Sequence, residues 1–214
     1  MYHIKINKER LKNHIQYDWW KYIVAILATV LLWNLATTVL KPRIPDNKKI
    51  HIFFVGEFVD EEKSEYLSNS ILEDFPELLK VDIDFIPLGG PGGLEYAGQQ
   101  KLMVMLGSQT GDMFIMDKED FNQIAQQGAF FPLDSFVNEN KGLLDIKDLE
   151  SYRLSVQDGD GEAHYYGIPM DYLVLPFITE YNTSDKAMGI TAYSKNLSTA
   201  LDVLEWMMKD TAIK

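Results

Sequence analysis

The stretch that most constrains the fold is IHIFFV, at residues 50–55. Five of its six side chains are apolar, without regular polar–apolar alternation, which is typical of a strand buried on both faces. Such strands belong to parallel sheets, because helices cover both faces of those sheets. Gly56 follows and ends the run. The stretch therefore predicts an inner strand of an α/β sheet.

Strand and helix patterns alternate downstream of this run. Further strands are expected at residues 81–87 (VDIDFIP) and 113–116 (MFIM). A helix is expected after each strand. The first is indicated by Leu67, Ile71 and Phe75 at helical spacing, and the second by the apolar run 102–106, which follows the glycine-rich stretch 89–93. The third is indicated by Phe121, Ile124 and Ala125, with Gly128 at its C-terminal end. We expect the run 102–106 to be buried. The βαβαβα order predicts a single three-layer α/β lobe with a mainly parallel sheet.

The pattern changes in the C-terminal third of the chain. An Asp-Gly-Asp-Gly turn between short runs at 155–157 and 164–166 predicts a β-hairpin. LVLPFIT, at 173–179, is typical of an edge strand, because its proline cannot donate a main-chain hydrogen bond. A last helix is expected from about Ser198, with the apolar stripe Leu197, Leu201, Leu204 and Met208.

Residues 22–40, YIVAILATVLLWNLATTVL, form an apolar run without a charged residue. At 1.5 Å per residue, a helix of this length covers about 28 Å, enough to cross the hydrocarbon core of a bilayer. We expect one uncleaved transmembrane helix. The alternative is a cleaved signal peptide. Two features argue against it: the polar region before the run is long, and no small-residue cleavage site follows the run. A slight excess of basic residues before the run favours a cytoplasmic N-terminus.

These patterns divide the chain into four segments of a single-pass protein of the cell membrane. They are a cytoplasmic arm at 1–21, a transmembrane helix at 22–40, a linker at 41–49 and an extracellular α/β lobe at 50–214. The linker contains two prolines and several charged residues, which favour extended chain.

Charge is distributed unevenly over these segments. Residues 1–49 carry nine Lys and Arg against three Asp and Glu, whereas residues 50–214 carry 11 against 29, a net charge of −18. So acidic a lobe is repelled by phosphate groups, and nucleic acid is therefore not an expected partner. The chain has no cysteine, which excludes disulfides, thiolate metal sites and a cysteine nucleophile.

Motifs for catalysis, metal binding or cofactor binding are not found. The glycine-rich stretch 89–93 lacks the G-K-[S/T] of a phosphate-binding loop and is typical of a turn. Residues 158–162 lack the spacing of an EF-hand calcium loop. The four histidines are scattered, and no nucleophile–base pattern occurs. We therefore expect no catalytic residue, metal ligand, cofactor or enzyme activity.

Short motifs in a fixed order suggest a family. They are K-L-x-x-x-L from Lys101, a strand that ends in Asp117, G-x-x-x-P-L-D-x-F from Gly128 to Phe136, Y-G-I-P from Tyr166 to Pro169, and Ser194-Lys195-Asn196 before a late helix. In this order they resemble the extracellular solute-binding proteins of ABC transporters, especially the sugar-binding type. The resemblance covers most of residues 50–210 and implies a periplasmic-binding-protein-like lobe.

One half of that architecture is missing. Members of the family enclose a ligand between two α/β lobes, and the second lobe is inserted after the Y-G-I-P hairpin. Here about 25 residues separate Pro169 from Ser194, too few for a lobe of comparable size. A transmembrane helix also replaces the family's usual lipid-anchored cysteine. A lone lobe leaves much of a small ligand in water, which makes tight solute capture improbable.

The carboxyl ends of parallel strands form the functional edge of an open sheet. Candidate ligand-binding residues there are Glu57, Phe58 and Asp117, to which the resemblance adds Tyr166, Asp171 and Tyr172. Aromatic faces and carboxylates suit a sugar or another small polar ligand. Structural roles are the alternative: Phe58 packing locally, Asp117 capping the next helix and Tyr166 filling a core.

Two functions fit these observations. The first is a membrane-anchored extracellular accessory or interaction subunit of a transport or sensing assembly, with another membrane or transport protein as its partner. The alternative is a reduced solute receptor that binds a sugar or another small polar ligand at the carboxyl edge of the sheet. An exposed apolar patch on the face left by the missing lobe would favour the first function, and a polar, aromatic-lined concavity there the second.

Overall fold

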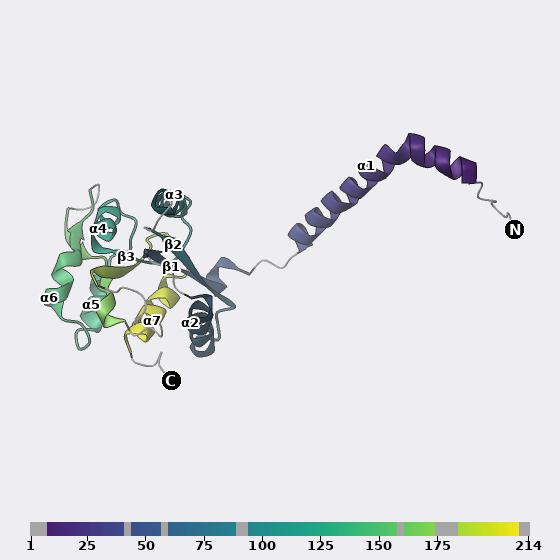
Figure 1. Cartoon of the computed structure of the whole chain (residues 1–214). Coiled ribbons are helices and arrows are strands. Elements are labelled where there is room, and N and C mark those ends of the chain that lie inside the picture. Colours follow the sequence, from purple (N-terminus) through teal and green to yellow (C-terminus); the bar gives the residue numbers. More distant parts are fainter. Residues whose placement is uncertain are drawn as a thin grey trace. The chain divides into compact units, whose positions relative to one another are not determined.

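The computed structural model describes residues 8–40, 44–56, 60–88, 94–157, 161–173 and 184–209, with the side chains of residues 8–15, 94 and 95 left out (Figure 1). The chain divides into two compact units, Met1–Arg43 and Ile44–Lys214. Within the second unit, part of the predicted linker is folded: Asp46–Lys48 is a 3-10 helix (η1), and Lys49 begins the first strand. The four-segment division otherwise stays a prediction.

The first unit contains one long helix, α1 (Lys8–Leu40). Its stretch Gln16–Leu40 is long and apolar enough to cross a membrane, a property that suits a membrane anchor and a signal sequence alike. The hydroxyl groups of Thr29 and Thr37 donate hydrogen bonds to main-chain oxygens four residues earlier, at 2.8 and 2.9 Å. These polar groups are therefore satisfied within the helix, as an apolar environment requires.

The second unit is built on a five-stranded sheet in the order β2-β1-β3-β7-β6. The strands are β1 (Lys49–Gly56), β2 (Lys80–Pro87), β3 (Met113–Asp117), β6 (Ile168–Pro169) and β7 (Lys186–Ile190). β1 is parallel to β2 and β3, whereas β7 is antiparallel to β3 and β6. The three predicted strands and their parallel pairing are confirmed, while β6 and β7 are not predicted by the sequence patterns.

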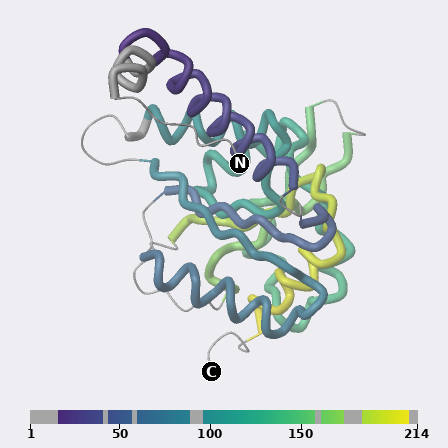
Figure 2. Tube along the Cα trace, turned by 90° about the vertical axis from the view of Figure 1, so that its right-hand side faces the viewer, coloured from purple at the N-terminus to yellow at the C-terminus, as the bar shows by residue number. Residues whose placement is uncertain are grey.

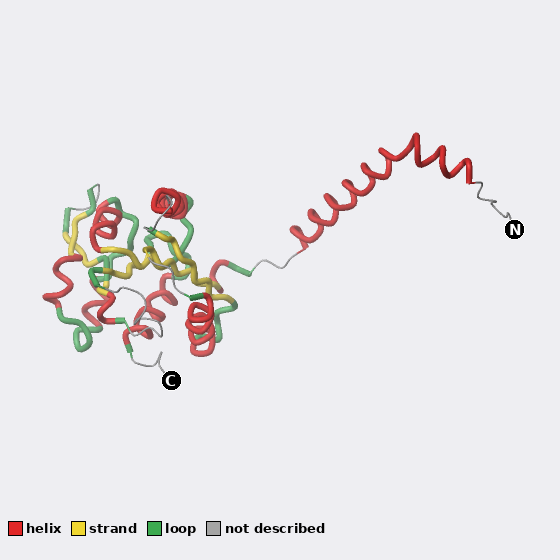
Figure 3. Tube along the Cα trace, viewed as in Figure 1, coloured by secondary structure: helices red, strands yellow, loops and turns green. Residues whose placement is uncertain are grey.

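Helices cover both faces of this sheet. They are α2 (Glu61–Asp74), α3 (Leu94–Gly107), α4 (Lys118–Gln126), α5 (Asp134–Glu139), α6 (Ile146–Leu149) and α7 (Leu197–Met208), with the 3-10 helices η2 (Glu150–Tyr152) and η3 (Met170–Tyr172). α2 and α7 lie on one face, and α3 and α4 on the other (Figures 1 and 3). A view turned by 90° shows the same layers (Figure 2). The predicted three-layer α/β lobe is confirmed.

The two faces have separate cores. Ile50, Ile52 and Phe54 of β1 pack toward α2 and α7, whereas Phe53 and Val55 pack toward α3 and α4. Successive residues of a strand point to opposite faces, so this alternation means that β1 is buried on both sides, as predicted. On the first face, α7 contributes the fully buried side chains of Val203, Leu204 and Met207. The predicted last helix is thereby confirmed.

α3 is less buried than its sequence predicts. Leu102 is buried, but Met103 and Val104 are 63% and 61% exposed, so the prediction that residues 102–106 are buried is wrong for these two side chains. The reason is geometric: a helix lying on a sheet buries one stripe, and successive residues are about 100° apart. A continuous apolar run on such a helix therefore places some side chains outside. Met103 and Val104 lie on the side that faces away from the sheet's core.

The predicted hairpin is confirmed as the antiparallel pair β4 (Arg153–Ser155) and β5 (Ala163–Tyr165). Most of its turn lies outside the described residues, as does the predicted edge strand 173–179 beyond Leu173. Gly128 follows α4 with a φ of +78°, a left-handed conformation that favours glycine at a helix C-terminus.

The folded unit is entered at the amino-terminal edge of the parallel strands. The side-chain amide of Asn196, at the start of α7, donates hydrogen bonds to the main-chain oxygens of Asp46 and Lys49, at 2.8 and 2.5 Å. Asp46 also forms an ion pair with Lys195 at 2.5 Å. These contacts fix the entry segment to the lobe at the edge opposite to the predicted ligand site.

Candidate functional site

Among the predicted site residues that the structure describes, Asp117 alone lies at the carboxyl edge of a parallel strand. It is the last residue of β3 and the N-cap residue of α4, but its side chain makes no capping hydrogen bond. Its carboxylate instead pairs with the ammonium group of Lys186, at 2.5 Å. Lys186 lies opposite Asp117 in the antiparallel β3–β7 register and is only 5% exposed. The pair joins the two halves of the sheet at this edge.

An acidic hollow lies beside this ion pair, with Asp117 in its wall. It has a volume of about 600 Å³ and is lined by Asp117, Lys118, Glu119, Asp120, Asn122 and Asp185. Partial burial, with the neighbouring carboxylates of Asp117 and Glu119, raises the pKa of Asp120, against the opposing effect of Lys186. Four acidic residues therefore line the hollow, and one of them, Asp117, is paired with Lys186. The hollow is polar, and no aromatic side chain is among its described lining residues.

Tyr166 is buried in the core beneath α4, with 5% of its surface exposed. Its ring makes an edge-on contact with the ring of His164, whose Nδ1 lies 3.0 Å from a carboxylate oxygen of Asp134. Tyr166 thus has the core-filling position that the sequence left open as an alternative. A ligand could reach it only after movement of the surrounding side chains.

Asp171 and Tyr172 lie on η3, and Tyr172 is on the other side of the sheet from Tyr166. Asp171 is exposed, and Tyr172 packs against the core formed with α2 and α7. The Tyr172 hydroxyl donates to the Asp148 carboxylate at 2.6 Å and accepts from the Asp145 amide at 3.1 Å. Burial and the bond to Asp148 raise the pKa of Tyr172. These bonds hold Tyr172 beside α6.

The predicted ligand site is therefore not assembled by the described residues. Asp117, Tyr166 and Tyr172 occupy three separate environments, while Glu57 and Phe58 lie outside the described residues. A ligand-binding role for any of the six stays a prediction. Among the described residues, no group of three or more His, Asp and Glu is placed to hold a metal ion.

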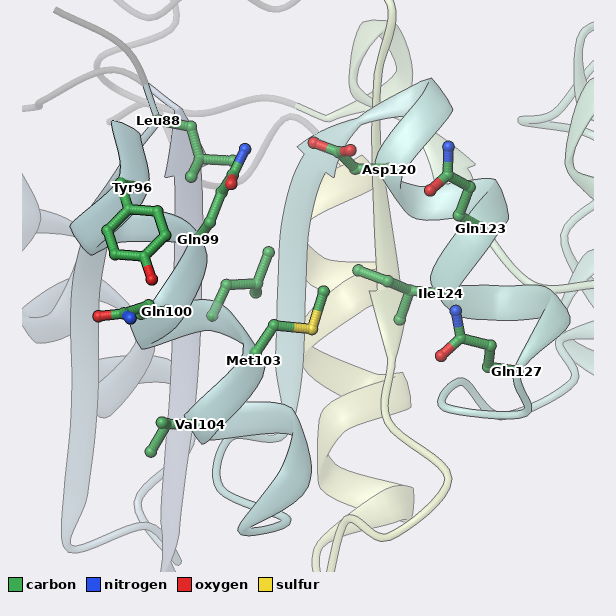
Figure 4. Close-up of a pocket in the computed structure, with 11 residues that line it drawn as sticks. Leu88, Tyr96, Gln99, Gln100, Met103, Val104, Asp120, Gln123, Ile124 and Gln127 are labelled. Carbon is green, nitrogen blue, oxygen red and sulfur yellow. The ribbon is translucent and has the colours of Figure 1, made fainter. Parts of the chain in front are cut away.

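A further cavity lies elsewhere, between α3 and α4 (Figure 4). We call it the α3–α4 groove; it has a volume of about 780 Å³. It is lined from the α3 side by Leu88, Tyr96, Gln99, Gln100, Leu102, Met103 and Val104, and from the α4 side by Asp120, Gln123, Ile124 and Gln127. Met103 and Ile124 point toward each other across it in Figure 4.

The chemistry of the α3–α4 groove differs from that of the acidic hollow. Its floor is apolar, its rims carry exposed glutamine amides, and Asp120 is the one charged residue among its described lining residues. Ligand pockets are typically of this size and are mostly apolar with a few polar groups. Sequence reasoning missed the groove because it treated the apolar run 102–106 as core. The signal was present in the length of that run, which exceeds what one buried stripe can accommodate.

No protein-family model and no curated protein matches the chain. Among solved structures, it is similar to a family 1 extracellular solute-binding protein from Alicyclobacillus acidocaldarius, at 22% identity and a TM-score of 0.42, over 60% of this chain and 28% of that one. It is also similar to an ABC substrate-binding protein from Listeria monocytogenes in complex with cycloalternan, at 18% identity and a TM-score of 0.40, over 56% and 28% of the two chains.

A third similar structure is an N-glycan transport solute-binding protein from Streptococcus pneumoniae in complex with Man5GlcNAc, at 22% identity and a TM-score of 0.39, over 56% of this chain and 24% of that one. The matched region is less than a third of the length of each of these three proteins. The chain resembles one lobe of the extracellular solute-binding proteins of ABC transporters, the family that its sequence motifs indicate.

Proposed function

We propose that the chain is a membrane-anchored, extracellular accessory subunit of a transport or sensing assembly, and that its lobe acts by binding another membrane protein. The α/β lobe, the motif order and the apolar helix Gln16–Leu40 support this proposal. The short distance between Pro169 and Ser194 leaves no room for the second lobe that would enclose a solute.

The observation that carries the proposal is the α3–α4 groove. Apolar side chains that lie together on a surface are typical of sites that bind a partner, whereas scattered ones are ordinary. Met103, Val104 and Tyr96 are each more than 60% exposed and line one cavity. By contrast, the carboxyl edge where a second lobe would sit is acidic in its described part. The proposed contact surface is therefore the α3–α4 groove.

Because the chain has no cysteine, single cysteines report on single positions. Gln127→Cys in the groove, Asp171→Cys at η3 and Asn138→Cys on α5 would each be labelled in intact cells with a membrane-impermeant maleimide. We expect all three to react before lysis, since the lobe is proposed to be extracellular. Labelling only after lysis would contradict the proposed location.

The same variants would then carry a photo-crosslinking maleimide. We expect at least one position to yield a crosslinked integral membrane protein, identified by mass spectrometry as part of a transport or sensing assembly. A lobe that reacts at the cell surface but crosslinks at none of the three positions would argue against an accessory role.

A reduced solute receptor is the second candidate, favoured by the acidic hollow at Asp117, since carboxylates accept hydrogen bonds from sugar hydroxyls. A ligand that binds the folded state raises stability by RT ln(1 + [L]/Kd), about 2.7 kcal/mol at a hundredfold excess over Kd. A thermal-shift screen of the full chain in detergent with mono- and disaccharides at millimolar concentration measures this directly. The absence of any shift would reject the receptor role.

A further inference from the structure

The occupant of the α3–α4 groove can be inferred from its shape. The lining residues of α3 run from Tyr96 to Val104, about 12 Å along the helix axis and just over two turns. The groove is open, because Met103 and Val104 are mostly exposed. A small molecule would keep much of its surface in water there. A larger partner that lies across both helices buries the rims as well, so the shape favours a polypeptide segment.

The charge of the groove indicates which kind of polypeptide segment would bind there. Asp120 is half-buried at its rim, and among the described residues its carboxylate has no hydrogen-bond or ion-pair partner. Burial and the carboxylates of Asp117 and Glu119 raise its pKa, and only Lys186 acts in the opposite direction. A partly buried carboxylate without a partner is costly. A cation brought by the partner would relieve that cost.

The remaining lining groups suit side chains of mixed polarity. The amides of Gln99 and Gln123 offer both donors and acceptors, one from each helix. Met103 and Ile124 supply apolar surface between them (Figure 4), and methionine adapts readily to different partners. An amphipathic helix places apolar residues at i, i+3, i+4 and i+7 along one face and polar residues beside them. A helix of two to three turns would match the length of the groove.

We propose that the α3–α4 groove binds an amphipathic helix of a partner membrane protein, with apolar side chains between Met103 and Ile124 and a Lys or Arg beside Asp120. This inference rests on the proposed function and names the chemistry of its partner. A second copy of this chain fits less well, because residues 50–214 carry a net charge of −18 and would repel each other. Anionic lipid is disfavoured for the same reason.

The test uses the full chain in nanodiscs of uncharged phosphatidylcholine. An environment-sensitive fluorophore is attached to Gln127→Cys at the groove and, as a control, to Asn138→Cys on α5. The probe is a peptide of about 18 residues with Leu and Lys at helical spacing, long enough to form a helix. We expect a saturable blue shift at position 127 and none at position 138. A matched Leu and Glu peptide should bind about tenfold more weakly or worse.

Two substitutions, made in the Gln127→Cys background, locate the contact. Asp120→Asn should weaken binding of the Lys peptide about three- to fivefold, as expected for a partly exposed ion pair. Met103→Gln should weaken it about tenfold through lost apolar burial. Leu143→Gln, at an exposed leucine between α5 and α6, is the matched control and should change nothing.

Four results would each overturn the inference: an equal shift at position 138, equal binding of the Glu peptide, unchanged binding after Asp120→Asn, or a blue shift on concentrating the protein alone, which would indicate a second copy. Failure here is distinguishable from failure of the proposed function. Suppose that the lobe is labelled at the cell surface and crosslinks from Asp171→Cys or Asn138→Cys, but that no peptide binds at the groove. The chain would then be an accessory subunit that binds its partner through another surface.

Discussion

The two faces of the sheet are covered by helices in different ways. On one face, α7 inserts Val203, Leu204 and Met207 so completely that none is exposed. On the other, α3 buries Leu102 but leaves Met103 and Val104 in solvent beside the α3–α4 groove. Both helices are rich in apolar residues, so composition does not distinguish them. The difference is in what lies next to each helix within the second unit, and the proposed partner would bind beside the exposed side chains of α3.

The largest expected effect tests whether the face of α7 is as closely packed as it looks. Leu204→Ala should lower the free energy of unfolding by about 2–5 kcal/mol, because it leaves a cavity in a fully buried core. Val104→Ala on α3 is the matched control and should change it by less than about 0.5 kcal/mol. Pulse proteolysis of the full chain in detergent over a urea series measures both. Equal losses would mean that the two faces are packed alike.

A smaller effect tests how α3 is held. A β-carbon at Gly98 would lie 1.9 Å from the main-chain oxygen of Pro87, so the helix approaches β2 only because residue 98 is glycine. Gly98→Ala should displace α3 and cost about 1–3 kcal/mol. Hydrogen exchange should accelerate in α3 and remain unchanged in α7.

Gly107→Ala is the control for that experiment. No atom lies within 4 Å of a β-carbon built at Gly107, and alanine favours helix by about 1 kcal/mol over glycine. We therefore expect no loss of stability. If Gly98→Ala were equally harmless, α3 would not be fixed by its contact with β2, and the groove would not have a defined width.

The smallest effect concerns Asp120. Its pKa is raised above the ordinary 3.8, mainly by burial and then by Asp117, so the folded state binds the proton more tightly than the unfolded state. Stability should therefore fall as the pH rises through a window that begins near 3.8. Asp120→Asn removes this penalty and should raise Tm at pH 7 by on the order of 1 °C, with no gain at pH 3.

Asp202→Asn, an exposed carboxylate on α7, is the matched control and should leave the pH dependence of Tm unchanged. A gain from Asp120→Asn that is the same at pH 3 and pH 7 would mean that ionisation of Asp120 is not its cause.

Much of the fold could be predicted from local pattern. The runs that became β1, β2 and β3 have bounds within one residue of those predicted, because a buried strand leaves a continuous or alternating apolar signature. β7 could not be predicted, since KAMGI begins with lysine and contains glycine. The first residue of β7, Lys186, can be buried only because its ammonium group donates a hydrogen bond to the carboxylate of Asp117, 69 positions away in the chain.

The candidate site was less predictable. Asp117 does lie at the carboxyl edge, as strand order requires, but Tyr166 and Tyr172 are separated by the sheet. A motif resemblance orders residues along the chain and does not say on which face each side chain lies. The α3–α4 groove could not be predicted, because it depends on the relative positions of two helices on the same face of the sheet, which local patterns do not give.

The sequence by itself determined an apolar helix long enough to span a membrane, an acidic α/β lobe and a chain too short between Pro169 and Ser194 for a second lobe. These properties depend on composition, periodicity and length, which need no contacts. Only the tertiary structure decided which apolar side chains remain exposed. Burial of a residue depends on what other segments pack against it, and no segment in the described part of the second unit covers Met103 and Val104 on α3.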